Sequence, residues 1–468
     1  MPHFDPEQML AWTGGRWCGM PARALTGFGV DSRRIREGQV FVALKTEKRD
    51  GHDYVESARQ SGASAALVSR PVPTSLIAQL VVDDPLEALQ AIARGHREAF
   101  KGKVVGVTGS AGKTSTKELV SLLLGGDASG VLATEGNLNN HIGVALTLTR
   151  LDPARHRLAV IEAGISGPGE MAVLARMIQP DLALTTLVGP AHLEELGGLE
   201  GVAREKAVLS KAVRKGGLSV FPASCEAYPP FRDLAESGAL VLERGDMPDG
   251  GGQESGRAYY SCEHGAEATR VSVEVGRFPS IQLVLPRTTD GMACNAALAA
   301  CAATKLGVSR AEIEERISLW RPVQLRGEWK ISEGRRLFLD CYNANPASMA
   351  DALGAFRAVA PAEDPRLYVI GCMEELGADA PSYHRQLGKS LSLRSNDLAV
   401  VVGGQADSVL KGALEAGAQT SQVEVVPTIE GLEARLAEFR GSVFVKGSRR
   451  YQLERAFLGA EHAEASHA

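Results

Sequence analysis

The sequence predicts an α/β protein made of three units, each with its own sheet. Three observations support this prediction. At 468 residues the chain is too long for a single hydrophobic core. Short apolar runs of strand length alternate with helical patterns along most of the chain, as a mostly parallel sheet requires. Over residues 104–123 an apolar run, a turn of small residues and a helical pattern follow one another, which is typical of a doubly wound sheet.

The N-terminal unit is expected to be small and to span residues 1–101. Its three runs of strand length lie at 40–44, 65–68 and 80–82. Its one helical pattern lies at 54–61. Lys101-Gly102-Lys103 forms the junction into the next strand.

The central unit is expected to span residues 102–321 and to hold a mostly parallel sheet. Its strand-like runs alternate with helices and lie at 104–107, 158–162 and 182–188. The glycine-rich stretch 245–252 is interpreted as a surface loop. Residues 258–261 and 270–285 are expected to form antiparallel segments. Residues 295–306 are expected to form an Ala-rich helix that ends at Gly307.

The C-terminal unit is expected to span residues 322–468 and to open at the Arg321-Pro322 step. Helical patterns separate four strand-like runs, at 337–340, 367–370, 398–402 and 443–446. This alternation predicts a second doubly wound, Rossmann-like sheet. Residues 461–468 are small and polar, so we expect a frayed end.

Composition excludes several classes of protein. The net charge of −5 leaves no basic excess with which to bind nucleic acid. The seven cysteines form no Cys-x-x-Cys pair, which argues against a zinc ribbon or a disulfide framework and for a reducing compartment. The N-terminal segment lacks the form of a signal peptide, and no apolar run has membrane-spanning length. We therefore expect a cytoplasmic protein that inserts into no membrane. We also expect a monomer, although the motifs leave the oligomeric state open.

Residues 106–118 contain a phosphate-binding motif, Gly-x-x-Gly-Lys-Thr, between the strand and the helix. Its small residues leave room for polyphosphate to contact backbone N–H groups at the helix N-terminus. Lys113 can then reach the β- and γ-phosphates, and the Thr114 hydroxyl can hold Mg²⁺. The longer general motif has a glycine where this chain has Val107, so the loop is a shortened variant. The sequence therefore predicts that the chain binds a nucleoside triphosphate.

Two further strand ends of the central sheet carry groups that suit a metal ion. The run 158–162 ends in Glu162, and the run 182–188 leads through a short turn to His192. Because parallel strands end at the same edge of a sheet, we expect both side chains to lie near Thr114. A carboxylate and an imidazole in that place can hold one or two Mg²⁺ ions against the triphosphate.

These residues resemble the Mur ligases, a family of ATP-dependent, amide-forming enzymes of peptidoglycan synthesis. The family shares the shortened phosphate loop, the strand-end glutamate and the downstream histidine, and it has a further lysine that corresponds to Lys206. The resemblance implies that Lys206 is carbamylated and becomes an anionic Mg²⁺ ligand. It also implies three domains that bind a UDP-sugar, ATP and the incoming amino acid or peptide, in chain order.

Other segments resemble the family members that add D-alanyl-D-alanine. They lie in all three units and read Asp31-Ser32-Arg33, Asp50-Gly51-His52-Asp53, Gly136-Asn137-Leu138-Asn139-Asn140-His141-Ile142-Gly143, Asp340-Cys341-Tyr342-Asn343-Ala344-Asn345-Pro346, Gly371-Cys372-Met373-Glu374-Glu375-Leu376-Gly377 and Val445-Lys446-Gly447-Ser448-Arg449. Members that add other amino acids have Ala-His in place of Asn343-Ala344. The chain departs from the family's usual residues at positions that carry no phosphate or metal group, namely Thr46, Ala207, Val208, Leu339 and Cys372.

The resemblance implies a role for each matching residue. The implied ATP-binding residues are Thr108, Gly109, Ser110, Ala111, Gly112, Lys113, Thr114, Ser115, Asn295, Arg326 and Asp340. The implied residues for the other two substrates are Ser32, Arg33, Asp50, Gly51, His52, Asn137, Asn139, Asn140, Tyr342, Asn343, Asn345, Lys446 and Ser448. The implied catalytic residues are Lys113, Glu162, His192 and Lys206, and the implied Mg²⁺ ligands are Thr114, Glu162, His192 and Lys206. Asparagine both donates and accepts hydrogen bonds, which suits uracil, ribose and amide groups.

The implied reaction is the ATP-dependent addition of D-alanyl-D-alanine to UDP-N-acetylmuramoyl-tripeptide. The tripeptide carboxylate attacks the γ-phosphate, and the dipeptide amine then attacks the acyl phosphate to give the pentapeptide precursor of peptidoglycan. Three substrates on three domains imply hinge closure, with residues 321–327 as the second hinge. The motifs leave open whether the third residue of the tripeptide is diaminopimelate or lysine. The nearest alternative is another amide ligase such as folylpolyglutamate synthase, and a more distant one is a P-loop regulatory NTPase.

Overall fold

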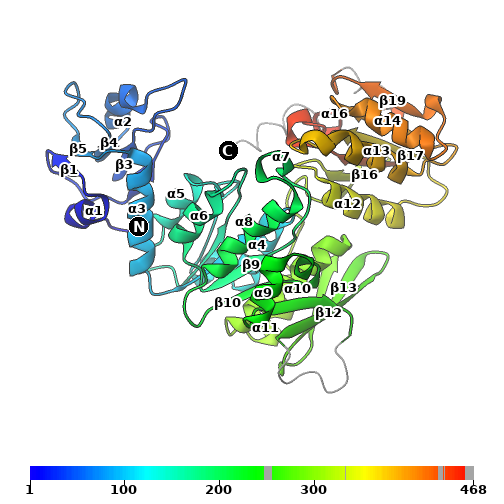
Figure 1. Ribbon diagram of the computed structural model, residues 1–468, viewed down its shortest axis with the longest axis horizontal. Coiled ribbons are helices and arrows are strands. Elements are labelled where there is room, and N and C mark those ends of the chain that lie inside the picture. The colour runs from blue at the N-terminus through cyan, green and yellow to red at the C-terminus, as the bar shows by residue number, and fades with distance from the viewer. Residues whose placement is uncertain (247–255, 333, 431–435, 437, 459–468) are drawn as a thin grey trace.

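The computed structural model contains three sheets, and it describes all residues except 247–255, 333, 431–435, 437 and 459–468. In Figure 1 the N-terminal sheet (blue) and the C-terminal sheet (yellow to orange) lie at opposite ends of the molecule, with the central sheet between them. This architecture confirms the predicted α/β class with parallel sheets. No helix in the described ranges has the length and apolar character that crossing a bilayer requires. Two of the predicted features fall almost wholly outside the described residues. They are the surface loop at 245–252 and the frayed end at 461–468.

The N-terminal sheet has the strand order β1-β5-β4-β3-β2, and only β1 runs antiparallel to its neighbour. Its strands are β1 Arg16–Cys18, β2 Gly27–Gly29, β3 Gln39–Val42, β4 Ala65–Val68 and β5 Ala78–Val81. Its helices are α1 Pro6–Thr13, the short 3-10 helix η1 Gly51–Tyr54, α2 Val55–Gln60 and α3 Pro85–Ala99. All four residues of β4 are buried, as expected for a parallel strand that is covered on both faces.

Helix α3 joins the N-terminal unit to the central unit. It begins at a cap, Asp84, whose side chain accepts from two backbone N–H groups of the first turn. Near its other end Arg97 is fully buried and donates to Ile178 O at 2.9 Å, to Gln179 O at 2.8 Å and to Asp181 Oδ2 at 2.9 Å. A buried guanidinium with its donors satisfied on the central unit fixes the two units to each other.

The central sheet has nine strands in the order β14-β13-β12-β11-β10-β9-β6-β8-β7. All neighbouring strands from β7 to β12 are parallel, and β13 and β14 add an antiparallel edge. Its strands are β6 Lys103–Thr108, β7 Val131–Ala133, β8 Leu158–Glu162, β9 Leu182–Thr185, β10 Leu218–Pro222, β11 Leu240–Arg244, β12 Arg257–His264, β13 Ala268–Val275 and β14 Ile281–Pro286. The antiparallel edge was predicted, whereas β7, β10 and β11 were not.

The described central residues form eight α-helices, most of which pack on this sheet. They are α4 Lys113–Leu123, α5 Gly143–Leu148, α6 Glu170–Ile178, α7 Leu193–Leu196, α8 Leu199–Lys211, α9 Pro229–Glu236, α10 Asp290–Lys305 and α11 Arg310–Ile317. The Ala-rich α10 is buried along most of its length, because its small side chains let neighbouring elements approach closely. Its N-terminal turn starts five residues before the predicted beginning at Asn295, capped by the Thr289 hydroxyl.

The C-terminal sheet has the order β15-β16-β20-β17-β18-β19, and only β15 is antiparallel. Its strands are β15 Glu328–Ser332, β16 Arg335–Asp340, β17 Arg366–Gly371, β18 Leu398–Val402, β19 Val423–Val426 and β20 Ser442–Lys446. Its helices are α12 Pro346–Val359, α13 Ala380–Leu391, α14 Ala406–Glu415 and α16 Arg455–Leu458. The four strands predicted for this unit, now β16, β17, β18 and β20, are confirmed. They form a parallel, Rossmann-like set with helices between them.

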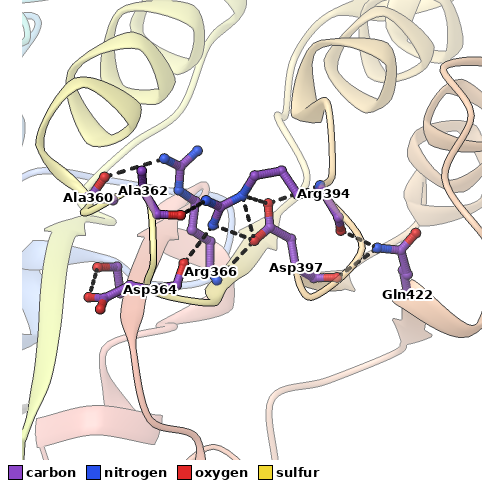
Figure 2. Close-up of polar contacts among 8 residues, drawn as sticks. Ala360, Ala362, Asp364, Arg366, Arg394, Asp397 and Gln422 are labelled. Atoms are coloured by element: carbon purple, nitrogen blue, oxygen red, sulfur yellow. Dashed lines mark hydrogen bonds and ion pairs between the residues drawn. The ribbon is translucent and has the colours of Figure 1, made fainter.

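A buried carboxylate organises the loops before β17 and β18. Asp397 is fully buried and accepts hydrogen bonds from the Arg394 side chain and from the backbone N–H groups of Arg394 and Arg366. Figure 2 shows that Arg394 also donates to the carbonyl oxygens of Ala362 and Asp364. Although burial opposes it, this set of hydrogen bonds lowers the pKa of Asp397. The network lies where the parallel strands begin, at the edge opposite to their carboxyl ends.

We expect Asp397→Asn to lower the free energy of unfolding by about 2–3 kcal/mol, because charge-assisted hydrogen bonds are lost in a buried place. The lowered pKa means that Asp397 stabilises the fold above its unfolded pKa of about 3.9 and loses this effect as the pH falls below it. The difference between wild type and variant, measured by urea unfolding, should therefore shrink below about pH 4. Asp379→Asn is the control, because Asp379 is exposed and its side chain makes no cap hydrogen bond.

Candidate active site

The phosphate-binding loop is a tight connection between β6 and α4. Gly112 precedes α4 with a φ of 78°, in the left-handed region that favours glycine. A Cβ atom on Gly112 would lie 2.5 Å from Asn295 Nδ2, and a Cβ atom on Gly109 would lie 1.9 Å from Thr186 Oγ1. A larger residue at either position would clash with a neighbouring side chain, so the loop needs both glycines.

The segment after β9 holds this loop in place. Residues 186–188 were predicted to continue the strand, but β9 ends at Thr185. Instead, Leu187 O accepts from Ser110 N at 2.8 Å, and Gly189 O accepts from Ser110 Oγ at 2.8 Å. The predicted extension is therefore wrong, because these backbone groups bind the loop. The first N–H groups of α4 have no partner within the helix and are left for an anionic ligand.

A cavity of about 690 Å³ opens in front of the loop and has walls from both the central and the C-terminal units. This volume is in the usual range for a small-molecule site. The predicted ATP-binding residues that line it are Ser110, Ala111, Gly112, Lys113, Thr114, Ser115, Asn295, Arg326 and Asp340. The predicted substrate-binding residues that line it are Asn137, Asn139, Tyr342, Asn343, Asn345 and Lys446. Thr108 is instead fully buried, and its hydroxyl donates to Ala163 O at 2.9 Å.

Lys113 is the cation of the loop. Its Nζ donates to Gly109 O at 2.9 Å, so the side chain folds back along the loop. Burial lowers the pKa of Lys113, the negative charge of Glu162 opposes this effect, and the positive charge of Arg326 adds to it. Phosphate oxygens in the cavity would supply the anionic partners that a buried ammonium lacks.

Glu162 presents one carboxylate oxygen without a partner. It ends β8, is only 1% exposed, and accepts from Asn139 Nδ2 at 2.8 Å through Oε1. Its other oxygen, Oε2, is buried and has no hydrogen-bond partner among the described residues. Thr114, in the first turn of α4, lines the same cavity. A hydroxyl and a free carboxylate oxygen are ligands that Mg²⁺ prefers, so these two residues fit a magnesium site.

His192 does not line the cavity in this structure. Its backbone has a φ of 52°, in the left-handed region, and its Nδ1 lies 2.6 Å from Glu375 Oε2 of the C-terminal unit. The backbone of Leu193 also donates to Glu375 O at 3.2 Å. The contact with His192 lowers the pKa of Glu375. His192 was predicted to lie beside Glu162. In the structure it is instead paired with Glu375, which belongs to the C-terminal unit.

Lys206 lies on α8 and is only 2% exposed. It does not line the cavity, but it is close enough to Lys113 for the two charges to interact. Burial lowers the pKa of Lys206 well below its usual value, and the positive charge of Lys113 adds to this effect. Glu205 opposes it. This burial could not be predicted from the sequence, because the residue lies in an ordinary helical pattern.

The C-terminal wall of the cavity is built on the ends of β16 and β20. Lys446, at the end of β20, is 1% exposed and donates to Asp340 Oδ2 at 2.6 Å and to Asn343 O at 3.1 Å. The Arg326 guanidinium lies over the Tyr342 ring, 3.9 Å from its centroid. These contacts fix the loop after β16 in one conformation.

Asn345 joins this wall to the phosphate loop. Its Oδ1 accepts from Ser348 N at 2.9 Å and so caps α12, while its Nδ2 donates to Ser110 O at 3.1 Å. Asn345→Ser should keep the cap but lose the bond to the loop, whereas Asn345→Ala should lose both. We expect roughly a three- to tenfold lower kcat/KM for both variants. We expect a lower melting temperature only for Asn345→Ala. Equal loss of stability in both would contradict the division between cap and bridge.

The predicted residues of the N-terminal unit do not reach this cavity. Asp50 pairs with Arg70 and accepts from His52, whose Nδ1 lies 2.6 Å from Asp50 Oδ1. The other ring nitrogen of His52 accepts from Ser69 N at 2.9 Å. Both nitrogens of His52 are thus used within the protein, and this residue positions Asp50. A Cβ atom on Gly51 would lie 2.6 Å from the backbone of the neighbouring segment, so Gly51 permits close packing.

Four other predicted substrate residues have partners or places of their own. Arg33 forms a two-point ion pair with Asp31 and is otherwise exposed. Ser32 is buried at 7% exposure. Asn140 Oδ1 accepts from the first N–H groups of α5, at 2.8 Å for Gly143. Ser448 precedes the short 3-10 helix η6 Arg449–Tyr451 and is also buried.

The cavity also has polar residues that the sequence analysis missed. Asp351 on α12 accepts from Gly291 N at 3.0 Å, at the start of α10, and so links the C-terminal and central units. Burial raises the pKa of Asp351. Thr186, Arg244, Tyr260 and Asp290 line the same cavity. A single aspartate on an amphipathic helix carries no local signal for such a role.

Three family models match this chain, in the order of its sheets. They are described as "Mur ligase family, catalytic domain", "Mur ligase middle domain" and "Mur ligase, glutamate ligase domain", and they cover residues 24–98, 107–302 and 325–449 respectively. The phosphate loop and Glu162 fall in the second match, and the loop with Asn345 falls in the third.

Relatives match over nearly the whole chain. The UDP-N-acetylmuramoyl-tripeptide–D-alanyl-D-alanine ligase of Escherichia coli is 32% identical, over 91% of each chain. A crystal structure of MurF from Acinetobacter baumannii superposes with a TM-score of 0.86 at 28% identity, covering all of both chains. The structure of the MurF ligase of Thermotoga maritima in complex with ADP superposes with a TM-score of 0.77 at 26% identity, covering 94% of this chain and 98% of that one. The chain therefore belongs to the Mur ligase family.

Proposed function

We propose that this chain is the ATP-dependent ligase that joins D-alanyl-D-alanine to UDP-N-acetylmuramoyl-tripeptide. The observation that carries the proposal is the single cavity in which the phosphate loop, Glu162 and the Asn343–Asn345 segment meet. It is supported by full-length relatives of this activity at about 30% identity, including those of Escherichia coli and Haemophilus influenzae. The product is the UDP-N-acetylmuramoyl-pentapeptide precursor of peptidoglycan.

The chemical problem is that a carboxylate must attack a triphosphate, so that two anions have to meet. The N–H groups at the start of α4 and the Lys113 ammonium bind phosphate oxygens and stabilise the charge of the transferring phosphoryl group. Arg326, stacked on Tyr342, adds a second positive charge at the same cavity. Thr114 and Glu162 would hold Mg²⁺, which screens the remaining repulsion between the carboxylate and the γ-phosphate. The carboxylate oxygen bonds to the γ-phosphorus as ADP leaves, and the dipeptide amine then displaces phosphate from the acyl carbon and loses a proton.

Lys206 is proposed to act as a carbamate. Its support is the buried amine with a lowered pKa, because a neutral amine is the form that adds CO₂. Carbamylation would replace an unfavourable buried cation near Lys113 by an anion that this cation attracts. Lys206 and His192 would then provide ligands for a second Mg²⁺, which requires His192 to leave Glu375.

The other two substrates are assigned to the outer units. We propose that residues 1–101 bind the UDP-sugar end through Ser32, Arg33 and the positioned carboxylate of Asp50. Residues 322–468 would bind D-alanyl-D-alanine, with Asn343, Lys446 and Ser448 near the reacting end. Residues 102–321 form the ATP-binding domain. Closure about the hinge at residues 321–327 would bring the substrate bound by residues 322–468 to the phosphates.

We propose that a monomer is active, because the phosphate loop, Glu162 and the Asn343–Asn345 segment meet within one chain. All seven cysteines are free, as expected for a reducing compartment such as the cytoplasm. Light scattering of the purified protein should give a mass near 49.5 kDa. A stable dimer would contradict the monomer proposal.

The two alternative functions are less well supported. A folylpolyglutamate synthase-like ligase is not favoured, because the relatives from Escherichia coli and Haemophilus influenzae, 32% and 30% identical over 91% of this chain, are D-alanyl-D-alanine ligases. A regulatory NTPase would not need the C-terminal wall, which closes the cavity through Asn345.

ADP release across a panel of substrates tests the proposal. We expect release only when UDP-N-acetylmuramoyl-tripeptide and D-alanyl-D-alanine are both present, and the panel includes both diaminopimelate and lysine tripeptides. Folate with glutamate should give none. ADP release that needs neither of the two peptide substrates, or that needs folate, would contradict the proposed function.

A further inference from the structure

Three side chains with metal-binding atoms meet at the rim of the nucleotide cavity. Cys262 and His264 lie two residues apart on β12, and Asp290 is the first residue of α10. Because side chains alternate along a strand, Cys262 and His264 point to the same face of the sheet. Asp290 also lines the cavity, whereas Cys262 and His264 do not. None of the three is assigned above to ATP, magnesium or either of the other substrates.

The three ligand atoms are spaced as around one tetrahedral ion. His264 Nε2 lies 3.0 Å from Asp290 Oδ1, Cys262 Sγ lies 3.4 Å from the same oxygen, and Sγ lies 3.9 Å from Nε2. Bonds of about 2.0–2.3 Å from zinc to sulfur, nitrogen and oxygen, at tetrahedral angles, put such atoms about 3.3–3.6 Å apart. The observed separations bracket these values, so small side-chain adjustments are enough to bind an ion.

A buried hydroxyl holds the ring of His264 and is compatible with either tautomer. Its Nδ1 lies 2.9 Å from Thr269 Oγ1, and that oxygen also accepts from Thr288 N at 3.1 Å. Thr269 is fully buried, so its hydroxyl is a fixed partner. If Nδ1–H donates to this oxygen, Nε2 faces the Asp290 carboxylate with its lone pair. In that tautomer a cation between the two atoms would bind both lone pairs, whereas a protonated Nε2 would donate to Asp290 instead.

Arg244 provides the competing explanation. Its Nη2 lies 2.9 Å from Asp290 Oδ1 and 3.3 Å from Cys262 Sγ, so the guanidinium contacts both side chains that can be anionic. Arg244 is about half exposed and can move away. Among the described residues Arg244 forms no hydrogen bond or ion pair with His264, which joins the cluster through Asp290 instead.

We propose that Cys262, His264 and Asp290 bind one Zn²⁺ ion, leaving its fourth position to water. A thiolate, an imidazole and a carboxylate together suit Zn²⁺ and not Mg²⁺, which prefers oxygen ligands alone. The ion would connect the sheet at β12 to the first turn of α10, whose later residue Asn295 contacts the phosphate loop. The site is separate from the proposed magnesium site at Thr114 and Glu162.

Cobalt substitution of the untagged, full-length protein tests this site. With excess Mg²⁺ present, one Co²⁺ per chain should bind and give a thiolate-to-cobalt charge-transfer band, which Zn²⁺ then removes. Cys262→Ser should abolish the band. His264→Asn should weaken Zn²⁺ binding by more than about tenfold, because even residues that only hydrogen-bond to a zinc ligand change the affinity by about that much. The control is Cys18→Ser, because Cys18 is also a half-buried free thiol.

Arg244→Gln separates the two explanations. If the cluster is a zinc site, the variant should bind Zn²⁺ at least as tightly as wild type, because a competing cation has been removed. The absence of the charge-transfer band in wild type, its persistence in Cys262→Ser, or the loss of Zn²⁺ binding in Arg244→Gln would overturn the proposal. Circular dichroism of each variant confirms that it is folded.

Discussion

Replacing Lys113 by alanine is expected to lower kcat/KM for ligation by at least about 10²–10³-fold, the usual cost of removing one preorganised group from a transition state. Lys113 is the ammonium that lines the cavity at the start of α4, and its Nζ donates to a backbone carbonyl of the loop. Phosphate oxygens would replace that partner. The substitution therefore removes charge at the phosphoryl group itself and leaves the sheet unchanged.

The readouts for Lys113→Ala are steady-state ADP release, the dissociation constant of UDP-N-acetylmuramoyl-tripeptide and the melting temperature. We expect the last two to stay close to the wild-type values, because the UDP-sugar end is assigned to a different unit. Near-normal turnover would refute the role of Lys113 in phosphate binding. A large drop in melting temperature would mean that the effect on turnover is structural.

Replacing Lys206 by alanine is expected to have the second largest effect, a loss of at least about 10²-fold in kcat. This expectation depends on the buried amine acting as a carbamate, so that the variant lacks an anionic ligand. A small carboxylate can occupy the space left by the side chain. Acetate or formate should therefore restore part of the activity of Lys206→Ala and should leave the wild type unaffected.

The matched control for Lys206→Ala is Lys211→Ala, on the same helix but exposed. It should keep full activity and should not respond to acetate. Mass spectrometry of the wild type under native conditions, with and without bicarbonate, gives an independent measurement of carbamylation. A fully active Lys206→Ala variant would show that the metal assignment is wrong.

Local patterns in the sequence were enough to predict the phosphate loop and the strand that ends in Glu162. Both depend on residues that are adjacent in the chain, namely an apolar run followed by small residues or by a carboxylate. The fold class followed from the same patterns. Three short central strands, β7, β10 and β11, were missed, because runs of three to five apolar residues resemble parts of buried helices.

Contacts between distant parts of the chain could not be predicted in this way. His192 meets Glu375 across two units, and Asp351 meets the start of α10. Motif resemblance picked out His52 and Asn140 but not what their side chains do, because that depends on which hydrogen-bond partners the fold brings near. The burial of Lys206, on which its proposed chemistry depends, is likewise a property of the packed structure.

The fate of one oxygen atom tests the central claim most directly. UDP-N-acetylmuramoyl-tripeptide labelled with oxygen-18 in the carboxylate that accepts the dipeptide is ligated by the wild-type enzyme, and the released phosphate is analysed by mass spectrometry. Activation by phosphorylation at the Lys113 cavity transfers one labelled oxygen from each carboxylate to phosphate, so labelled phosphate should equal the amide formed. Unlabelled phosphate alongside normal amide formation would contradict it.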